Sequence, residues 1–372
     1  MGRIEADRKG NRMTDNRYVI PLEDLKSFCA DALIQEGMHE EYARITAEVL
    51  AETDALGTHS HGTKNLHNYI RKMRAGGMAL NAEPVVLKEG PGYALIDGKA
   101  AIGMVPAYKA MELAIQKASE CGIASVVVKN TSHFGAAGYY ANMASNKNMI
   151  GLAFSNVDTN MTIPGARGKV IGNNPMSYGV PAGHYSPVFL DIAMSSVASL
   201  KVVQARKDGK PVPDTWIIDG EGLPTTDPSR YPEEGAMQPM AAHKGYGLAL
   251  MIEILTGVLS GGGIMSEVPS WLFSMETKNN VSHNFIVIDV SKFMEPDEFN
   301  QRMEGVVNYL HDIPKAKGTE RIYYPGEMEW DKYRKVNAEG LSLPEDVAAS
   351  LQGLADDFGL TVPWAQLEGN GE

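Results

Sequence analysis

The sequence predicts an α/β protein with two domains, one of which is helical and discontinuous along the chain. At 372 residues the chain exceeds the usual size of a single domain. Its central part alternates β-branched runs with helical stretches, which is typical of an α/β layer. The parts before and after it are both mainly helical. We therefore expect residues 18–85 and 238–372 to form a helical domain and residues 86–237 to form an α/β domain.

Residues 1–17 are polar and mixed in charge, and they lack the apolar core of a secretory signal. We expect these residues to be a disordered extension, or the result of a misplaced start of translation, with Met13 as the true first residue. The two cysteines, Cys29 and Cys121, each lie in an apolar helical pattern and neither belongs to a CxxC pair. Two such thiols fit a reducing compartment, so we expect a cytoplasmic protein with buried, unreactive cysteines.

Apolar residues recur at helical spacing in three stretches of the first 80 residues, namely 21–36, 39–56 and 65–75. Glycines follow the second and third stretches and are typical helix ends. The segment 58–62 is therefore expected to be a turn between two helices.

The central part predicts a series of strands joined by helices. The expected strands are residues 93–97, 123–129, 149–155, 186–192 and 215–218, and the expected helices between the first three are 103–121 and 136–146. This order and spacing indicates βαβ connectivity. Residues 209–235 are rich in Pro, Gly and Asp and predict a long surface loop.

The last third of the chain is helical again. A long helix is expected from Lys244 to the glycines at 261–263, a strand at 285–290, and helices at 291–309 and 343–359.

Composition argues against two classes of partner. The formal net charge is −12, whereas nucleic-acid-binding faces are rich in Lys and Arg. Charged residues, His or Gly interrupt every apolar run before it reaches the roughly 18–20 residues of a membrane helix. We therefore expect no nucleic-acid or membrane partner. A site for an anionic small molecule must concentrate cations locally.

Two histidines are the main candidates for chemistry. His61 lies in the expected inter-helix turn beside Ser60, which can orient its ring, and His133 follows the expected strand 123–129 directly. The carboxyl end of a buried strand is where open α/β sheets place ligands. Histidine titrates near neutral pH and so suits proton transfer. The structural alternative for either residue is a hydrogen bond that caps a helix end.

Polar and glycine-rich segments predict where a larger ligand is held. Residues 172–175 can cradle a phosphate or ribose with their backbone, and Asp191 at the end of a strand can bind a pair of ribose hydroxyls. Lys244 at the start of a long helix is a potential anion site. No Gly-x-Gly-x-x-Gly follows a strand, and no Gly-x-Ser-x-Gly or P-loop motif is present.

Taken in order, these segments resemble the type-2 malate/L-lactate dehydrogenase family, which includes sulfolactate, ureidoglycolate and diketogulonate oxidoreductases. The matching motifs are Ser60-His61-Gly62, Asp97-Gly98, Asn130 to Tyr140, Ser155-Asn156, Gly172 to Pro175, Asp191-Ile192-Ala193, Pro224 to Pro228, Lys244 to Leu248 and Pro325-Gly326-Glu327.

The resemblance implies NAD(P)-dependent interconversion of a small 2-hydroxy acid and its 2-oxo acid. It also implies a homodimer and a non-Rossmann cofactor domain, which accounts for the missing glycine motif. His61 and His133, with Ser60, are then the catalytic candidates. The candidate cofactor contacts are Ser155, Asn173, Asn174, Pro175, Asp191, Ile192, Ala193, Lys244, Pro325, Gly326 and Glu327. The candidate substrate contacts are Lys64, Asn65 and Tyr69.

Two positions depart from the family pattern. Asn65 stands where members often carry an Arg in reach of the substrate carboxylate, with Lys64 beside it, and Leu200 stands where a Gly is common. An ammonium group is a point charge and holds a carboxylate differently from a bidentate guanidinium. We see no Arg after Asp191 for a 2′-phosphate, so NAD is preferred and NADP stays possible.

Other functions are possible from the same residues. His59 and His61, with Asp54, His67 and His133, are the ligands that a metal-dependent hydrolase would need. His-x-His places both rings on one face only in a strand, and no strand precedes residue 59. We therefore expect no metal. A binding protein for small acids is a third interpretation, but it gives no reason for two histidine sites.

Overall fold

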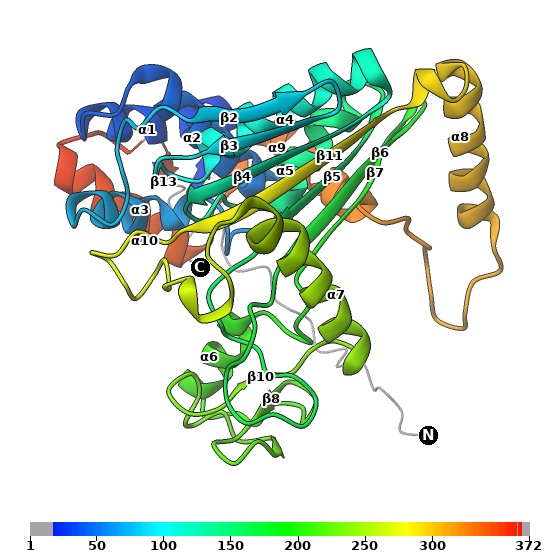
Figure 1. Cartoon of the computed structure of the whole chain (residues 1–372). Helices are drawn as coiled ribbons and strands as arrows, with labels where there is room; N and C mark the ends of the chain where they lie inside the picture. Colours follow the sequence, from blue (N-terminus) through cyan, green and yellow to red (C-terminus); the bar gives the residue numbers. More distant parts are fainter. Residues whose placement is uncertain (1–17, 363, 367–372) are drawn as a thin grey trace.

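The computed structural model describes residues 18–362 and 364–366, so the extension expected at residues 1–17 lies outside the described residues. Its centre is a seven-stranded mixed sheet in the order β2-β3-β4-β11-β5-β6-β7 (Figure 1). The strands are β2 (Val85–Gly90), β3 (Tyr93–Asp97), β4 (Ile123–Thr131), β5 (Met149–Ser155), β6 (Met176–Ala182), β7 (Tyr185–Ile192) and β11 (Val281–Asp289). The α/β fold class expected from the sequence is confirmed.

The parallel unit predicted from strand–helix–strand spacing is present. β3 and β4 pair in parallel and are joined by α4 (Met104–Cys121). The next unit differs, because β4 and β5 are not neighbours: β11 lies between them and pairs antiparallel with both. The sequence predicted this strand at residues 285–290, within the segment assigned to the helical domain. The segment 238–372, which was expected to be mainly helical, therefore supplies β11 to the central sheet. The proposed division into two domains stays a prediction.

Close packing of α5 (Ala137–Ser145) on the sheet fixes the chain just after His133. A Cβ added at Gly151 of β5 would lie 2.5 Å from the carbonyl oxygen of Ala141, and one at Gly179 of β6 would lie 2.7 Å from the same atom. Real Cβ atoms do not approach so closely, so both positions require glycine. The helix therefore sits directly on the strands, and its N-terminal segment is held at the end of β4.

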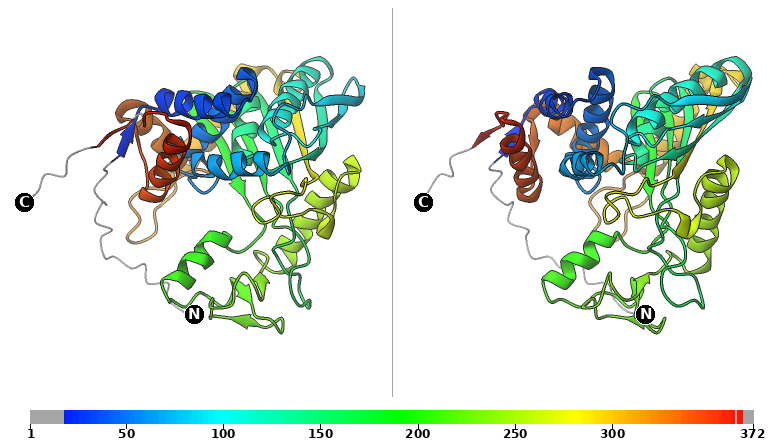
Figure 2. Two further views of the ribbon diagram at one scale, coloured as in Figure 1. Left: turned by 90° about the vertical axis from the view of Figure 1, so that its left-hand side faces the viewer. Right: turned by 60° about the vertical axis from the view of Figure 1, so that its left-hand side comes forward.

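Helices from both ends of the chain pack together beside the sheet. They are α1 (Leu22–Gln35), α2 (Glu40–Ala55), α3 (Leu66–Arg74), α9 (Glu327–Glu339) and α10 (Glu345–Phe358). α10 contacts α1 and α3, and Figure 2 shows the C-terminal helix in red against the N-terminal helices in blue. A small sheet adds to this contact, with β1 (Tyr18–Ile20) between β12 (Leu341–Ser342) and β13 (Ala365–Gln366).

A second, smaller hydrophobic core lies below the sheet in Figure 1. It contains residues of α6 (Ser199–Lys207), of the short strands β8 (Ile217–Ile218) and β10 (Ala236–Met237), and of α7 (His243–Glu253), which continues as a π-helical turn to Val258. The short strand β9 (Pro224–Thr225) pairs with β8. The remaining helix, α8 (Pro296–Asp312), stands at the far edge beside β6. Within the described residues, none of the helices combines the length and the apolar character that crossing a bilayer requires.

One local expectation was wrong. Cys29 is buried, as predicted, but the side chain of Cys121 is exposed at the end of α4.

Candidate active site

The two predicted histidines meet. The ring centroids of His61 and His133 are 5.6 Å apart with an interplanar angle of 29°. His61 comes from the turn between α2 and α3, and His133 from the segment between β4 and α5. Segments far apart in the sequence thus bring two imidazoles to one place, as a site for proton transfer requires.

Besides His61, the ring of His133 has Tyr69, Gly135 and Trp271 as neighbours. Its Nδ1 lies 2.6 Å from the hydroxyl oxygen of Tyr69 and 3.4 Å from the amide nitrogen of Gly135. The indole of Trp271 stacks on the ring, with centroids 4.5 Å apart and an angle of 17°. Burial, and then the charges of His61 and His283, hold the pKa of His133 well below its usual value. The ring is therefore neutral near pH 7, with Nδ1 occupied inside the protein.

His61 is held by its neighbours in the turn. Ser60 Oγ lies 2.9 Å from His61 Nδ1, and the side-chain amide of Asn65 donates to the carbonyl oxygen of Ser60 at 2.8 Å. Burial also lowers the pKa of His61. The serine predicted to orient the ring does contact it, and both histidines of the pair are neutral near pH 7.

A buried carboxylate fixes the same turn. Asp54 is fully buried and accepts hydrogen bonds from His59 Nδ1 at 2.8 Å and from the amide and hydroxyl of Thr63 at 2.9 and 2.5 Å. A Cβ at Gly62 would lie 2.1 Å from Asp54 Oδ1, so this position of the Ser-His-Gly motif must be glycine. His59 therefore supports the turn that presents His61.

The geometry gives no support to the hydrolase alternative. Within residues 18–362 and 364–366, no group of three or more His, Cys, Asp or Glu side chains is arranged to hold a metal ion. The two histidines of the proposed ligand pair have other neighbours, since His59 binds Asp54 and His61 contacts Ser60.

Of the three substrate candidates, only Tyr69 forms a hydrogen bond with a histidine of the pair, His133. Lys64 forms an ion pair with Asp346 of α10. The amide nitrogen of Asn65 is engaged by the backbone of Ser60. In this arrangement, neither Lys64 nor Asn65 takes the place of the arginine that the family resemblance leads one to expect at position 65.

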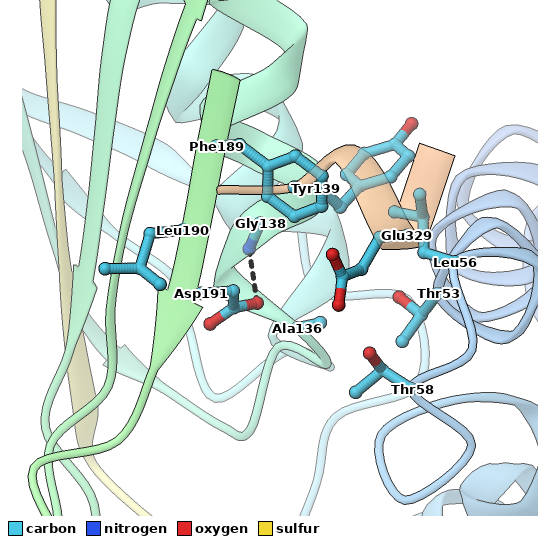
Figure 3. Close-up of a pocket in the computed structure, with 11 residues that line it drawn as sticks. Thr53, Leu56, Thr58, Ala136, Gly138, Tyr139, Phe189, Leu190, Asp191 and Glu329 are labelled. Atoms are coloured by element: carbon cyan, nitrogen blue, oxygen red, sulfur yellow. Dashed lines mark hydrogen bonds between the residues drawn. The ribbon is translucent and has the colours of Figure 1, made fainter. Parts of the chain in front are cut away.

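A pocket of about 110 Å³ lies between α2, α5, β7 and α9 (Figure 3), and neither histidine of the pair lines it. Thr58 from the turn of His61 and Ala136 from the segment of His133 both line it. Asp191 lies at the end of β7, and its Oδ2 accepts a 2.7 Å hydrogen bond from the amide of Gly138. Figure 3 shows the carboxylate of Glu329, from α9, facing the same space. Burial raises the pKa of Asp191 to about 6, so it is largely ionised near pH 7.

The segment Pro325-Gly326-Glu327 is fixed against β7 and contributes one wall of this pocket. The amide of Phe189 donates to the carbonyl oxygen of Pro325 at 3.0 Å. Glu327 is buried and accepts from His311 Nε2 at 3.0 Å and also pairs with Arg321. Gly326 itself lines the pocket, whereas the carboxylate of Glu327 is used to hold the turn.

Other cofactor candidates have partners inside the protein. The side chain of Asn174 is fully buried, donates to Glu253 Oε2 at 2.7 Å and to the carbonyl of Ala249 at 3.0 Å, and accepts from the amide of Val157. Ser155 Oγ donates to the carbonyl of Asn156 and lies 2.9 Å from His283 Nδ1. These side chains therefore hold neighbouring segments together inside the protein.

The remaining candidates lie outside the pocket. Asn173 accepts from the side-chain amide of Asn160 at 3.1 Å. Lys244 is exposed in the first turn of α7, and the two residues before this helix, Ala241 and Ala242, have positive φ values of 47° and 52°. Pro175, Ile192 and Ala193 are partly exposed near the ends of β6 and β7.

Three residues of the site were missed by the sequence analysis. Trp271 stacks on His133, Glu329 faces Asp191, and His283 is fully buried on β11, where its ring stacks on Phe134 at 4.3 Å. None stands in a pattern that signals a site. Each is brought there by the pairing of distant segments.

Comparison with known proteins gives one consistent result. The family model described as malate/L-lactate dehydrogenase matches residues 20–352. The malate dehydrogenase of Pyrococcus horikoshii is 37% identical over 321 residues, covering 84% of this chain and 88% of that protein. The L-sulfolactate dehydrogenase of Methanocaldococcus jannaschii is 32% identical over 344 residues (92% and 98%), and the ureidoglycolate dehydrogenase (NAD(+)) of Escherichia coli is 33% identical over 329 residues (88% and 93%).

Solved structures agree in fold. Malate dehydrogenase from Entamoeba histolytica superimposes with a TM-score of 0.87 at 27% identity, covering 93% of this chain and 99% of that one. Sulfolactate dehydrogenase from M. jannaschii gives a TM-score of 0.85 at 33% identity, with 92% and 98% covered.

Proposed function

Since the chain belongs to the malate/L-lactate dehydrogenase family, we propose that it interconverts a small 2-hydroxy acid and its 2-oxo acid by NAD-dependent hydride transfer, with acid/base catalysis by its histidine pair. Family membership supports a 2-hydroxy acid dehydrogenase. The cofactor, the roles of the histidines and the substrate are the parts that we propose here.

The observation that carries the proposal is the contact of His61, His133 and Tyr69. A neutral His133 accepts the hydroxyl proton of the substrate during oxidation and returns it during reduction, which contributes roughly 10²–10⁴-fold in rate. Burial raises the pKa of Tyr69, so its hydroxyl keeps its proton. Because Nε2 must carry the lone pair that takes the substrate's proton, the neutral ring carries its own proton on Nδ1 and donates it to the Tyr69 hydroxyl oxygen, and the protonated ring makes the same contact. The Tyr69 hydroxyl therefore orients His133 in both states and leaves Nε2 for the substrate oxygen.

We assign the second histidine a supporting role. His61 lies 5.6 Å from His133, centroid to centroid, and Ser60 orients it through Nδ1. A neutral imidazole in this position binds the same substrate oxygen or the neighbouring carboxylate. The assignment predicts a larger loss of kcat for His133→Asn than for His61→Asn.

We assign the pocket of Figure 3 to the ribose of a nicotinamide dinucleotide. Asp191 keeps Oδ2 bonded to Gly138, which leaves Oδ1 to accept from ribose hydroxyls, and Thr53 and Thr58 add further hydroxyls to the lining. A 2′-phosphate would meet the carboxylates of Asp191 and Glu329, and like charges repel. We therefore propose NAD over NADP. When bound, NAD supplies the hydride acceptor, and these residues hold its ribose.

A homodimer is proposed from an exposed apolar face of α7 and the π-helical turn. The members are large apolar side chains, each more than a third exposed. Leu248, Met251, Ile254 and Val258 follow one another at intervals of three or four residues, and Leu259 is next to Val258. Apolar faces of this kind in soluble proteins mark interfaces. A second copy of the chain is the occupant that fits the family resemblance. We further propose a cytoplasmic location, in keeping with the free cysteines.

The test is an absorbance assay at 340 nm with NADH or NADPH against pyruvate, oxaloacetate, sulfopyruvate, oxalurate and diketogulonate. We expect at least one of these oxo acids to be reduced, with NADH preferred, and we expect His133→Asn to lower kcat by about 10²-fold or more. Near-normal turnover by both His133→Asn and His61→Asn, with circular dichroism unchanged, would refute the histidine mechanism. An enzyme inactive with every acid would refute the reaction class.

A further inference from the structure

Residues 269–279, called here the Trp271 loop, pass over the catalytic histidine. Trp271 stacks on His133 at 4.5 Å and on Tyr69 at 5.1 Å, with interplanar angles of 17° and 24°. One face of the His133 ring is therefore covered by an indole. At the loop's exposed part, Phe273 has 77% of its surface accessible.

A buried lysine holds this loop. Lys72 has no exposed surface, and its ammonium group donates to the carbonyl oxygens of Ser274 at 2.6 Å and Thr277 at 2.9 Å. It forms no ion pair with any of the residues that the structure describes. A buried cation without a carboxylate is costly unless its hydrogen bonds are satisfied. Lys72 lies three positions after Tyr69 on α3, so one face of this helix contacts His133 and also anchors the loop.

Two further contacts fix the loop at other points. The side chain of Asn279 accepts from Ser132 Oγ at 2.8 Å and donates to the carbonyl of Pro269 at 2.7 Å, which ties both ends of the loop to the residue before His133. A Cβ at Gly77 would lie 2.0 Å from the carbonyl oxygen of Met275. The middle of the loop therefore rests directly on the backbone after α3.

We propose that the Trp271 loop is a fixed wall of the substrate site, in which Trp271 determines substrate size and Lys72 is the positioning residue that sets its distance from His133. The inference rests on the proposed function, because it takes His133 as the catalytic group. The indole excludes water from one face of the imidazole and limits the space beside the substrate's C2 side chain. The site then favours short 2-oxo acids such as pyruvate over bulky ones such as phenylpyruvate.

Substitution of the wall itself tests the specificity claim. Trp271→Ala is expected to raise the ratio of kcat/KM for phenylpyruvate to that for pyruvate by about tenfold or more, since filling or emptying a pocket by a few carbons changes discrimination on this scale. Trp271→Phe retains an aromatic face and is expected to restore much of the activity on pyruvate. An unchanged ratio in Trp271→Ala overturns the assignment of Trp271.

Displacement of the wall without touching Trp271 tests the positioning claim. Lys72→Met removes the two carbonyl contacts, and Gly77→Ala pushes the loop at Met275; each is expected to lower kcat/KM by about tenfold to a hundredfold. Matched controls are available for both changes. Arg71→Met removes an exposed charge of α3, and Gly305→Ala adds a methyl group on the exposed side of α8, where the backbone is helical and the new group meets nothing within 4 Å. Both controls are expected to stay within about twofold of the parent.

A spectroscopic readout separates positioning from loss of stability. Protonation of His133 is expected to quench the fluorescence of the stacked Trp271. The signal of Trp271 is the difference between the fluorescence of the parent and that of Trp271→Phe, and in a pH titration its midpoint is expected below the usual histidine pKa of about 6.5. Lys72→Met hydrates the ring, so its midpoint moves upward. If Lys72→Met keeps the kinetic constants and the titration midpoint of the parent, the proposal that Lys72 positions the Trp271 loop is refuted, although the enzyme is active. A parent that reduces none of the oxo acids refutes the proposed function instead, whatever the midpoint does.

Discussion

Removal of the Tyr69 hydroxyl is the sharpest test of how His133 is oriented. In Tyr69→Phe the phenyl ring still stacks on Trp271, but Nδ1 of His133 loses its 2.6 Å partner, and its other close neighbour is the amide nitrogen of Gly135 at 3.4 Å. A buried polar atom left without a good partner costs about 1–3 kcal/mol. Because about 1.36 kcal/mol corresponds to tenfold in rate, we expect kcat/KM to fall by about fivefold to 150-fold if this cost falls on the transition state.

The measurement is steady-state reduction of the preferred oxo acid at pH 7, with thermal unfolding followed by circular dichroism. Tyr333→Phe is the matched control, since it also removes a tyrosine hydroxyl, one that contacts Glu52 at 3.4 Å outside the site. It should leave kcat/KM within about twofold. A Tyr69→Phe enzyme as active as this control would show that the hydroxyl does not orient His133, and the mechanism built on it would be abandoned.

Three further predictions follow from other contacts. Asp191→Asn should shift the preference from NADH toward NADPH by about tenfold in the ratio of kcat/KM, since one of two repelling carboxylates is removed; an unchanged ratio contradicts the ribose assignment. Ile254→Lys should convert a dimer to a monomer in light scattering after gel filtration, and a parent that is already monomeric contradicts the interface. Burial lowers the pKa of His283 from 6.5 to about 3, so the unfolded chain binds more protons in that window and the free energy of unfolding falls as pH falls. Urea titrations at pH 7 and pH 5 should show that the free energy of unfolding falls between these two pH values by about 2 kcal/mol less in His283→Gln than in the parent. An equal fall in both proteins would contradict the lowered pKa of His283.

The local parts of the fold and site were predictable because their signals are local. The strand expected at residues 149–155 is found at those residues, and the helix expected at 103–121 begins one residue later. His133 was placed at the end of β4 by the β-branched run before it. The meeting of His133 with His61 followed from the resemblance, since no spacing in either motif specifies a partner.

The remaining parts depend on contacts between distant segments. Asn174 was predicted to touch a cofactor, but its amide is engaged by Glu253 on α7, a partner that no local pattern reveals. Trp271 and Lys72 form one structure with His133 only after the loop has packed on α3. Propensity and periodicity describe each segment separately, and they contain no information on such pairs.

The central position of β11 has a consequence for how the chain is made. Without it, β2-β3-β4 and β5-β6-β7 are two separate three-stranded sheets whose edges at β4 and β5 have no partner in the sheet. A ribosome delivers β4 and β5 long before residues 281–289, so the nascent chain exposes two unpaired strand edges while the rest is synthesised. Such long-range closure slows folding, because loop entropy is lost before the late strand docks. Expression at low temperature or with chaperones should therefore raise the soluble yield, and a chain ended before residue 281 should aggregate.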